Sequence, residues 1–195
     1  MIKAVSKNFL KCLGVLLFSI IANVAYCNDR RQLLKIQQYL NSLKHITAKF
    51  VQVDSDNNTQ RGKFFLSRPG KLRWEYQDPK KITIVFNGSK IFYYDKELDQ
   101  RSEYKTQDSL IYFLISPNIN FLSTSSDYYV QSFGKRDKRI TLEIKKKHRS
   151  KKERLVIRFN ESPLKLTSIE IKKSLRIFID SVIDYKSLDK NLFRT

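Results

Sequence analysis

The chain has 195 residues and carries 38 Lys and Arg against 19 Asp and Glu, which gives a formal net charge of +19. It contains two histidines in unrelated settings and five glycines, and it lacks a G-x-S-x-G elbow, an H-E-x-x-H motif and a glycine-rich phosphate loop. We therefore expect a protein that is not an enzyme and that holds no metal and no cofactor.

The N-terminal segment has the pattern of a secretory signal. Three lysines in the first eleven residues precede an apolar run over residues 12–22, which has the length of a signal core and falls short of the ~20 residues that a membrane span needs. Ala25 and Cys27 suit the −3 and −1 positions of a cleavage site. A lipoprotein signal is disfavoured because Tyr26 stands where a small residue is expected before Cys27.

Cleavage there would leave residues 28–195 as a single domain. We expect this mature chain to be free of cysteine, because Cys12 and Cys27 would leave with residues 1–27. Its size suits one hydrophobic core, so that packing and sheet hydrogen bonds supply the stability.

The mature chain opens with a predicted helix. Asp29 can cap it, and an apolar stripe at helical spacing runs to about residue 43; the stripe consists of Leu33, Ile36, Leu40 and Leu43. Alternating apolar residues then predict a first strand through Ile46, Ala48 and Phe50.

Residues Gly62 to Tyr76 predict a β-hairpin around a Pro69-Gly70 turn. Side chains alternate between faces along a strand, so one face is charged and the other apolar; the apolar face carries Phe64, Leu66, Leu72, Trp74 and Tyr76. Arg68 shares the parity of that apolar face. A cation there needs acceptors, so Arg68 either snorkels to water from the strand end or bonds to buried carbonyls.

The remaining chain is read mostly as strands. Ile82–Phe86 and Ile91–Tyr94 flank an Asn87-Gly88 turn, and Asp108 can cap an apolar helix over 109–115 that ends before Pro117. Five more strands are predicted over 128–133, 140–144, 155–159, 164–171 and 175–185. A parity slip between Leu166 and Ile169 predicts a bulge.

The basic charge has two interpretations that the sequence leaves open. It favours attraction to anionic lipid or to an acidic partner, or it reflects a lysine-rich composition. The densest cluster, Lys145 to Lys152, lies between two predicted strands and is expected to form a solvated hairpin loop. We expect no nucleic-acid binding, because the export signal and the lack of any nucleic-acid motif oppose it.

The hairpin resembles a family of carriers. The pattern R-P-G-x-L-x-W-x-Y, formed by Arg68, Pro69, Gly70, Leu72, Trp74 and Tyr76, is similar to the LolA-like periplasmic carriers that bring lipoproteins to the outer membrane of Gram-negative bacteria. Similarity extends over Tyr39–Gln52 upstream, over Pro79 and Val85–Asp95 downstream, and into the ending S-L-D-K-N-L-F-R-T. Phe92 departs from the family's tryptophan and keeps the aromatic character.

The resemblance implies a mostly β fold with α-helices: an incomplete antiparallel β-barrel, or half-barrel, whose helices form a lid over an apolar cavity. Some ten one-sided strands and two apolar helices agree with it. The expected acyl-chain cavity residues are Phe64, Leu66, Leu72, Trp74, Tyr76, Ile84, Phe86, Tyr93, Leu110 and Phe113. For each wall residue plain core packing fits the pattern as well. The resemblance further implies that Arg68 latches the lid.

The family relationship also implies a function. The chain would be a monomeric periplasmic chaperone that takes lipoproteins from an ATP-driven inner-membrane release complex, shields their acyl chains and delivers them to an outer-membrane receptor. Two alternatives stay open: a general periplasmic lipid-binding protein on the same scaffold, and a membrane-surface interaction protein that uses its basic face and no cavity.

Overall fold

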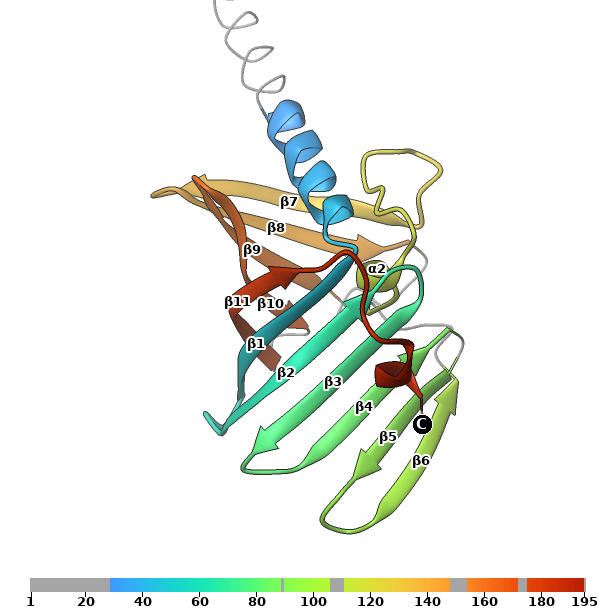
Figure 1. Ribbon diagram of the computed structural model, residues 1–195. Coiled ribbons are helices and arrows are strands. Elements are labelled where there is room, and N and C mark those ends of the chain that lie inside the picture. The colour runs from blue at the N-terminus through green and yellow to red at the C-terminus, as the bar shows by residue number, and fades with distance from the viewer. Residues whose placement is uncertain (1–28, 89, 106–110, 148–153, 172–174, 195) are drawn as a thin grey trace, which may run out of the picture. The chain divides into compact units, whose positions relative to one another are not determined.

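A computed structural model describes residues 29–88, 90–105, 111–147, 154–171 and 175–194 (Figure 1). The predicted signal at 1–27, the cap Asp108, the cavity candidate Leu110 and the basic segment 148–152 lie outside the described residues. The chain separates into two units, Met1–Ile36 and Gln37–Thr195. Described residues 29–36 of the first unit are helical, and this helix runs on to residue 42 in the second, close to the predicted end at 43.

The second unit contains one antiparallel sheet of 11 strands. Its strands are β1 (His45–Asp54), β2 (Thr59–Ser67), β3 (Lys71–Asp78), β4 (Ile82–Asn87), β5 (Lys90–Asp95), β6 (Gln100–Lys105), β7 (Tyr128–Arg136), β8 (Arg139–Lys146), β9 (Leu155–Glu161), β10 (Leu164–Ile171) and β11 (Leu175–Asp184). All ten predicted strands are present. Strand β6 was missed, because all its side chains are exposed and none of the apolar alternation that marks a half-buried strand appears in it.

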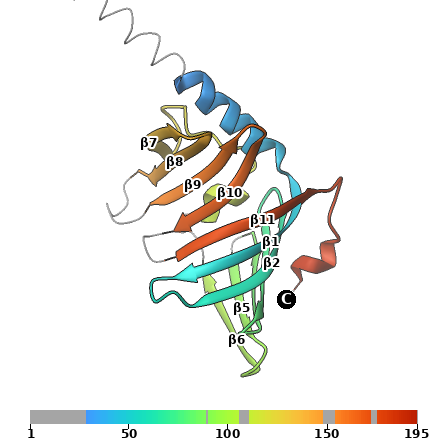
Figure 2. The same ribbon diagram turned by 90° about the vertical axis from the view of Figure 1, so that its left-hand side faces the viewer.

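The sheet consists of two meanders joined along one seam. The order is β6-β5-β4-β3-β2-β1-β11-β10-β9-β8-β7, so every neighbour is adjacent in sequence except β1 and β11, which pair from Ile46 opposite Asp184 to Asp54 opposite Leu175. Strands β6 and β7 are the two edges of this sheet, which is therefore an open half-barrel and not a closed one (Figure 2).

Period-two alternation gives the sheet one apolar face, as predicted. In β1 and β2 the inward side chains are buried, among them Ile46, Phe50 and Phe64, while their neighbours are more exposed. The register slips between Leu166 and Ser168 where β10 meets β9, which confirms the predicted bulge and returns Ile169 to the buried side.

Helix α2 (Ile111–Ile115) covers the end of the β2–β3 hairpin. Its described part is buried, with Phe113 and Ile115 each about 1 % exposed; this confirms a helix that is apolar on more than one side. The Ile115 carbonyl accepts a hydrogen bond of 2.9 Å from the N–H of Gly70, which has φ +75° in the hairpin turn. Glycine allows this conformation without strain.

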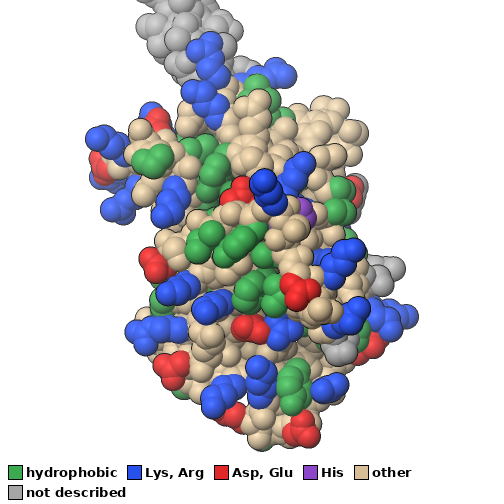
Figure 3. Space-filling model, viewed as in Figure 1, with side chains coloured by type: hydrophobic (Ala, Val, Ile, Leu, Met, Phe, Trp, Pro, Cys, Tyr) green, Lys and Arg blue, Asp and Glu red, His purple; other side chains and the backbone are tan. Residues whose placement is uncertain are grey.

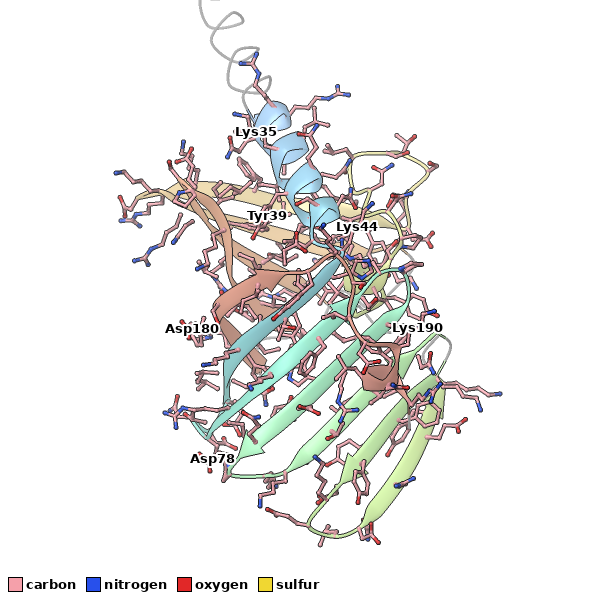
Figure 4. All side chains as sticks on the ribbon, viewed as in Figure 1. Lys35, Tyr39, Lys44, Asp78, Asp180 and Lys190 are labelled. Carbon is pink, nitrogen blue, oxygen red and sulfur yellow. The ribbon has the colours of Figure 1, made fainter. Side chains whose placement is uncertain are left out.

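The face opposite the apolar one carries the short 3-10 helix η1 (Lys190–Phe193). It lies over β3 and β4, as the labelled Lys190 shows (Figure 4). Arg73 Nη1 donates to the Leu192 carbonyl at 3.0 Å, and the Phe193 ring is 2 % exposed. Within the described residues no helix has the length and apolarity to cross a membrane.

Candidate functional site

A small apolar cavity of about 160 Å³ lies on the inner face of the sheet. Both meanders contribute to its wall: β3, β4 and β5 supply Leu72, Trp74, Tyr76, Ile84, Phe86 and Ile91, and β10 and β11 supply Ile171, Leu175 and Ile177. No charged side chain is among them. A wall of this kind attracts apolar groups without directional preference.

Five of the ten predicted cavity residues line this cavity, namely Leu72, Trp74, Tyr76, Ile84 and Phe86. Phe64 and Leu66 are buried in the same face, and Phe64 lies behind the wall, stacked on the Trp74 ring with centroids 5.2 Å apart. These two are core residues.

Two further candidates do not line the cavity. Tyr93 pairs with Ile84 across β4 and β5, is half-buried and lines a separate hollow formed by β3–β6. Phe113 is buried in α2, where its ring meets that of Tyr128 at 5.2 Å. The prediction missed Ile91, Ile171, Leu175 and Ile177; the alternation of the last two with Ile179 indicated a one-sided strand, but nothing local indicated that β11 faces β3.

The wall is built on a cluster of aromatic rings. The Trp74 ring lies between Phe64 and Phe50, whose centroid is 4.8 Å away, and Phe50 meets Tyr76 edge-on at 5.3 Å. The Tyr76 hydroxyl donates to Gln52 Oε1 at 2.7 Å. Burial raises the pKa of Tyr76 to about 12, so the phenol stays neutral across the physiological range.

Arg68 is buried at the end of β2, with 7 % of its surface exposed. Its Nε donates to the Leu114 carbonyl of α2 at 2.7 Å, and its Nη1 donates to the Leu40 carbonyl of the helix over 29–42. Snorkelling to water, one of the two interpretations drawn from the sequence, is therefore wrong for this residue. Burial lowers the pKa of Arg68 to about 10, so the guanidinium is charged at neutral pH.

Side-chain amides of residues 37–42 also bind the backbone of the segment that follows α2. Asn41 Nδ2 donates to the Ile119 carbonyl at 2.9 Å, and the Ile119 N–H donates back to Asn41 Oδ1 at 2.7 Å. Gln37 Oε1 accepts from the Phe121 N–H at 3.2 Å. Residues 37–42, α2 and the segment that follows α2 thus form one hydrogen-bonded unit, which Arg68 joins to the sheet.

The cavity is smaller than a ligand pocket. Pockets that enclose small molecules measure roughly 300–1,000 Å³, against about 160 Å³ here. The bonds from Arg68 to two helical carbonyls fasten the end of the β2–β3 hairpin, near the wall residue Leu72, to those helices.

Comparisons with known proteins agree with this architecture. An uncharacterized protein of Rickettsia prowazekii is 23% identical over 93% of this chain and 84% of its own length. An outer-membrane lipoprotein carrier protein of Pseudomonas aeruginosa is 30% identical over 53% of this chain, which spans about half (54%) of that relative. The crystal structure of an uncharacterized conserved protein from Thermus thermophilus shares the fold with TM-score 0.51 at 9% identity, over 85% of this chain and 93% of that one. The family profile described as "Outer membrane lipoprotein carrier protein LolA" matches residues 41–195, and the chain therefore belongs to the LolA family of lipoprotein carriers.

Proposed function

We propose that the chain is a periplasmic carrier that binds the acyl chains of lipoproteins in the inner-face cavity and delivers them to the outer membrane. The observation that supports this most directly is an uncharged apolar cavity on the inner face of the sheet, beside a hairpin that one buried arginine fastens to two helices. Residues 1–27 would direct export and be removed, and residues 28–195 would act as a monomer.

The physical need for such a carrier is large. Exposing an acyl chain to water costs about 0.8 kcal/mol per methylene, so that one chain of sixteen carbons represents roughly 12 kcal/mol. Transfer through water without shielding is correspondingly rare. An apolar wall with few polar groups offsets most of that cost and still allows release, because it contains no strong directional bonds.

The proposed cycle needs partners that supply energy and direction. An inner-membrane ATP-driven complex would load the carrier as it opens, and an outer-membrane receptor would accept the lipoprotein. The cavity itself offers no catalytic group, since its lining in the described residues is hydrocarbon, one indole and one neutral phenol.

A transfer assay with paired variants tests the proposal. Leu72→Glu and Trp74→Glu place a carboxylate in the wall, where desolvation costs several kcal/mol unless the group protonates. Gln77→Glu adds the same charge on the exposed face of the same strand and is the matched control. We expect the wall variants to lose lipoprotein acceptance and the control to keep it.

The same assay separates the alternatives. Acceptance of a triacylated lipoprotein that depends on the release complex supports the carrier function. Uptake of free lipid with no such acceptance would favour a general lipid-binding protein, which the lack of polar anchors in the cavity permits. Wall variants that fold and still bind an apolar fluorescent probe as well as the parent would refute the role of this cavity.

A further inference from the structure

A second hollow lies on the outer face of β3–β6, opposite the apolar cavity. It measures about 470 Å³. The β4 residues Thr83 and Val85 line it, and they alternate with Ile84 and Phe86, which line the inner cavity. The two hollows are therefore separated by the sheet. Figure 3 shows this outer face, on which Lys and Arg side chains lie among Asp and Glu over the lower strands.

Positive charge collects around this outer pocket. A single carboxylate, Glu103, lines it together with four cations: Arg73, Lys96, Arg101 and Arg194. Glu103 already pairs with Lys90 at 2.6 Å, and Arg73 pairs with Glu75 at 2.6 Å. The other three cations have no acidic partner within 4.0 Å among the residues that the structure describes. Such a hollow attracts an anion.

The floor of the pocket is apolar and aromatic. Val85 and Phe92 face each other in register across β4 and β5. The guanidinium of Arg101 lies over the Tyr94 ring, 4.9 Å from its centroid. Stacking occupies the face of the guanidinium and leaves its N–H edge able to donate two parallel hydrogen bonds to an oxyanion.

One buried donor in the pocket is unused. The Thr83 side chain is 5 % exposed, and its hydroxyl finds no hydrogen-bond partner among the described residues. The protein encloses this oxygen, so a ligand in the hollow would not reach it, and the case for an anion rests on the cations.

We propose that the outer pocket binds an anionic amphiphile of the phosphate-ester class, with the chemistry of an acidic phospholipid head group. Arg101 and Arg194 would hold the phosphate, and the carbons next to it would lie on Phe92 and Val85. The pocket volume lies within the range of ligand pockets, roughly 300–1,000 Å³, which suits a head group and its first carbons. The proposal is independent of the carrier function and adds a contact with the membrane surface.

Binding of short-chain lipid monomers to the purified full chain tests this site. Dihexanoyl phosphatidylglycerol below its micelle concentration is compared by calorimetry with dihexanoyl phosphatidylcholine, which has the same tails and no net charge. We expect the anionic lipid to bind at least about tenfold more tightly, because both lipids carry the phosphate but the choline cation of the zwitterion is repelled by the four cations of the pocket. Equal affinities would overturn the proposal, since the inner apolar cavity would bind both alike.

Charge-matched variants locate the site. The double variant Arg101→Gln, Arg194→Gln should lose about tenfold or more of its affinity for the anionic lipid. The control Arg136→Gln, Arg139→Gln removes the same charge from the exposed β7–β8 hairpin and should bind as the parent does. All four side chains are exposed, so equal melting temperatures are expected. Equal losses in both double variants would indicate a diffuse charge effect and overturn the proposal.

Two further probes distinguish the source of the anion. Binding to vesicles that contain phosphatidylglycerol, lost in the pocket variant and kept in the control, would support a membrane lipid as the ligand. Inorganic phosphate should bind more weakly than the lipid, because it makes no contact with the apolar floor. Phosphate that binds as tightly as the lipid would overturn the amphiphile assignment and leave a site for a free oxyanion.

Discussion

Replacing Arg68 by leucine should trap cargo on the carrier. In the closed state the guanidinium makes two hydrogen bonds to the carbonyls of Leu40 and Leu114, each worth about 1.5–3 kcal/mol because the donor is charged. Burial of the charge works against this gain: the fall in the pKa of Arg68 from 12.5 to about 10 corresponds to roughly 3 kcal/mol at 1.36 kcal/mol per unit.

The difference between the hydrogen-bond energy and the burial cost sets how strongly Arg68 favours the closed state. Two bonds give about 3–6 kcal/mol, and subtracting the burial cost leaves a net contribution of roughly 0–3 kcal/mol to the closed state. The midpoint, about 1.5 kcal/mol, is close to a tenfold change in an equilibrium constant. Arg68→Leu should therefore raise the ratio of the cargo-bound form to the closed empty form about tenfold. The apolar contacts with cargo remain.

The assay measures loading and handover separately. A triacylated lipoprotein is released from membranes onto the carrier and then transferred to the acceptor. We expect Arg68→Leu to load normally and to transfer slowly, and Arg68→Lys to be intermediate, because an ammonium keeps the charge and loses the planar fork that reaches two carbonyls. Equal transfer by the parent and a folded leucine variant would refute the latch.

Three further changes have defined outcomes. Gly62→Ala should destabilise the fold by about 1–3 kcal/mol, because a Cβ there would lie 2.0 Å from the Glu75 carbonyl oxygen and 2.7 Å from the Phe50 ring. A variant that unfolds in urea with the same free energy as the parent would contradict this. In the parent, Tyr76 should lower the stability by up to about 2.7 kcal/mol between pH 10 and 12, because the unfolded phenol ionises near 10 while the pKa of folded Tyr76 is about 12. Tyr76→Phe should lack that part of the slope and keep the part due to Tyr128, whose pKa burial also raises to about 12. An unchanged slope would show that Tyr76 does not cause it. Mass spectrometry of the exported chain should give a form that starts after Cys27, and an acylated Cys27 would contradict it.

Local periodicity predicts most of the sheet and part of the site. The hairpin from Gly62 to Tyr76 was predictable because alternation and a Pro-Gly turn agree within fifteen residues. Strand β6 was not, because an edge strand with both faces in water has no apolar side to mark it. Its pairing with β5 is a property of the sheet and not of its own sequence.

The hollow itself could not be predicted from patterning. Phe64 and Trp74 are both inward and lie opposite each other in register, yet one packs behind the wall and the other forms it. Ile171 and Ile177 complete the wall from about a hundred residues along the chain, and only the pairing of β1 with β11 brings them near β3 and β4. The parity of Arg68 predicted a need for acceptors; which carbonyls meet it depends on the placement of the helices.

The seam between β1 and β11 has a consequence for how the chain acquires its cavity. Each meander can form hairpin by hairpin from neighbours in sequence, but the seam pairs Phe50 with Ile179 and so must wait for the last strand. Leu175 and Ile177 of that strand are part of the cavity wall. A chain that crosses a membrane from its N-terminus would therefore have no acyl-binding hollow until β11 has emerged. Nascent carriers would be unable to sequester lipid during translocation, and capacity for cargo would appear in one late step.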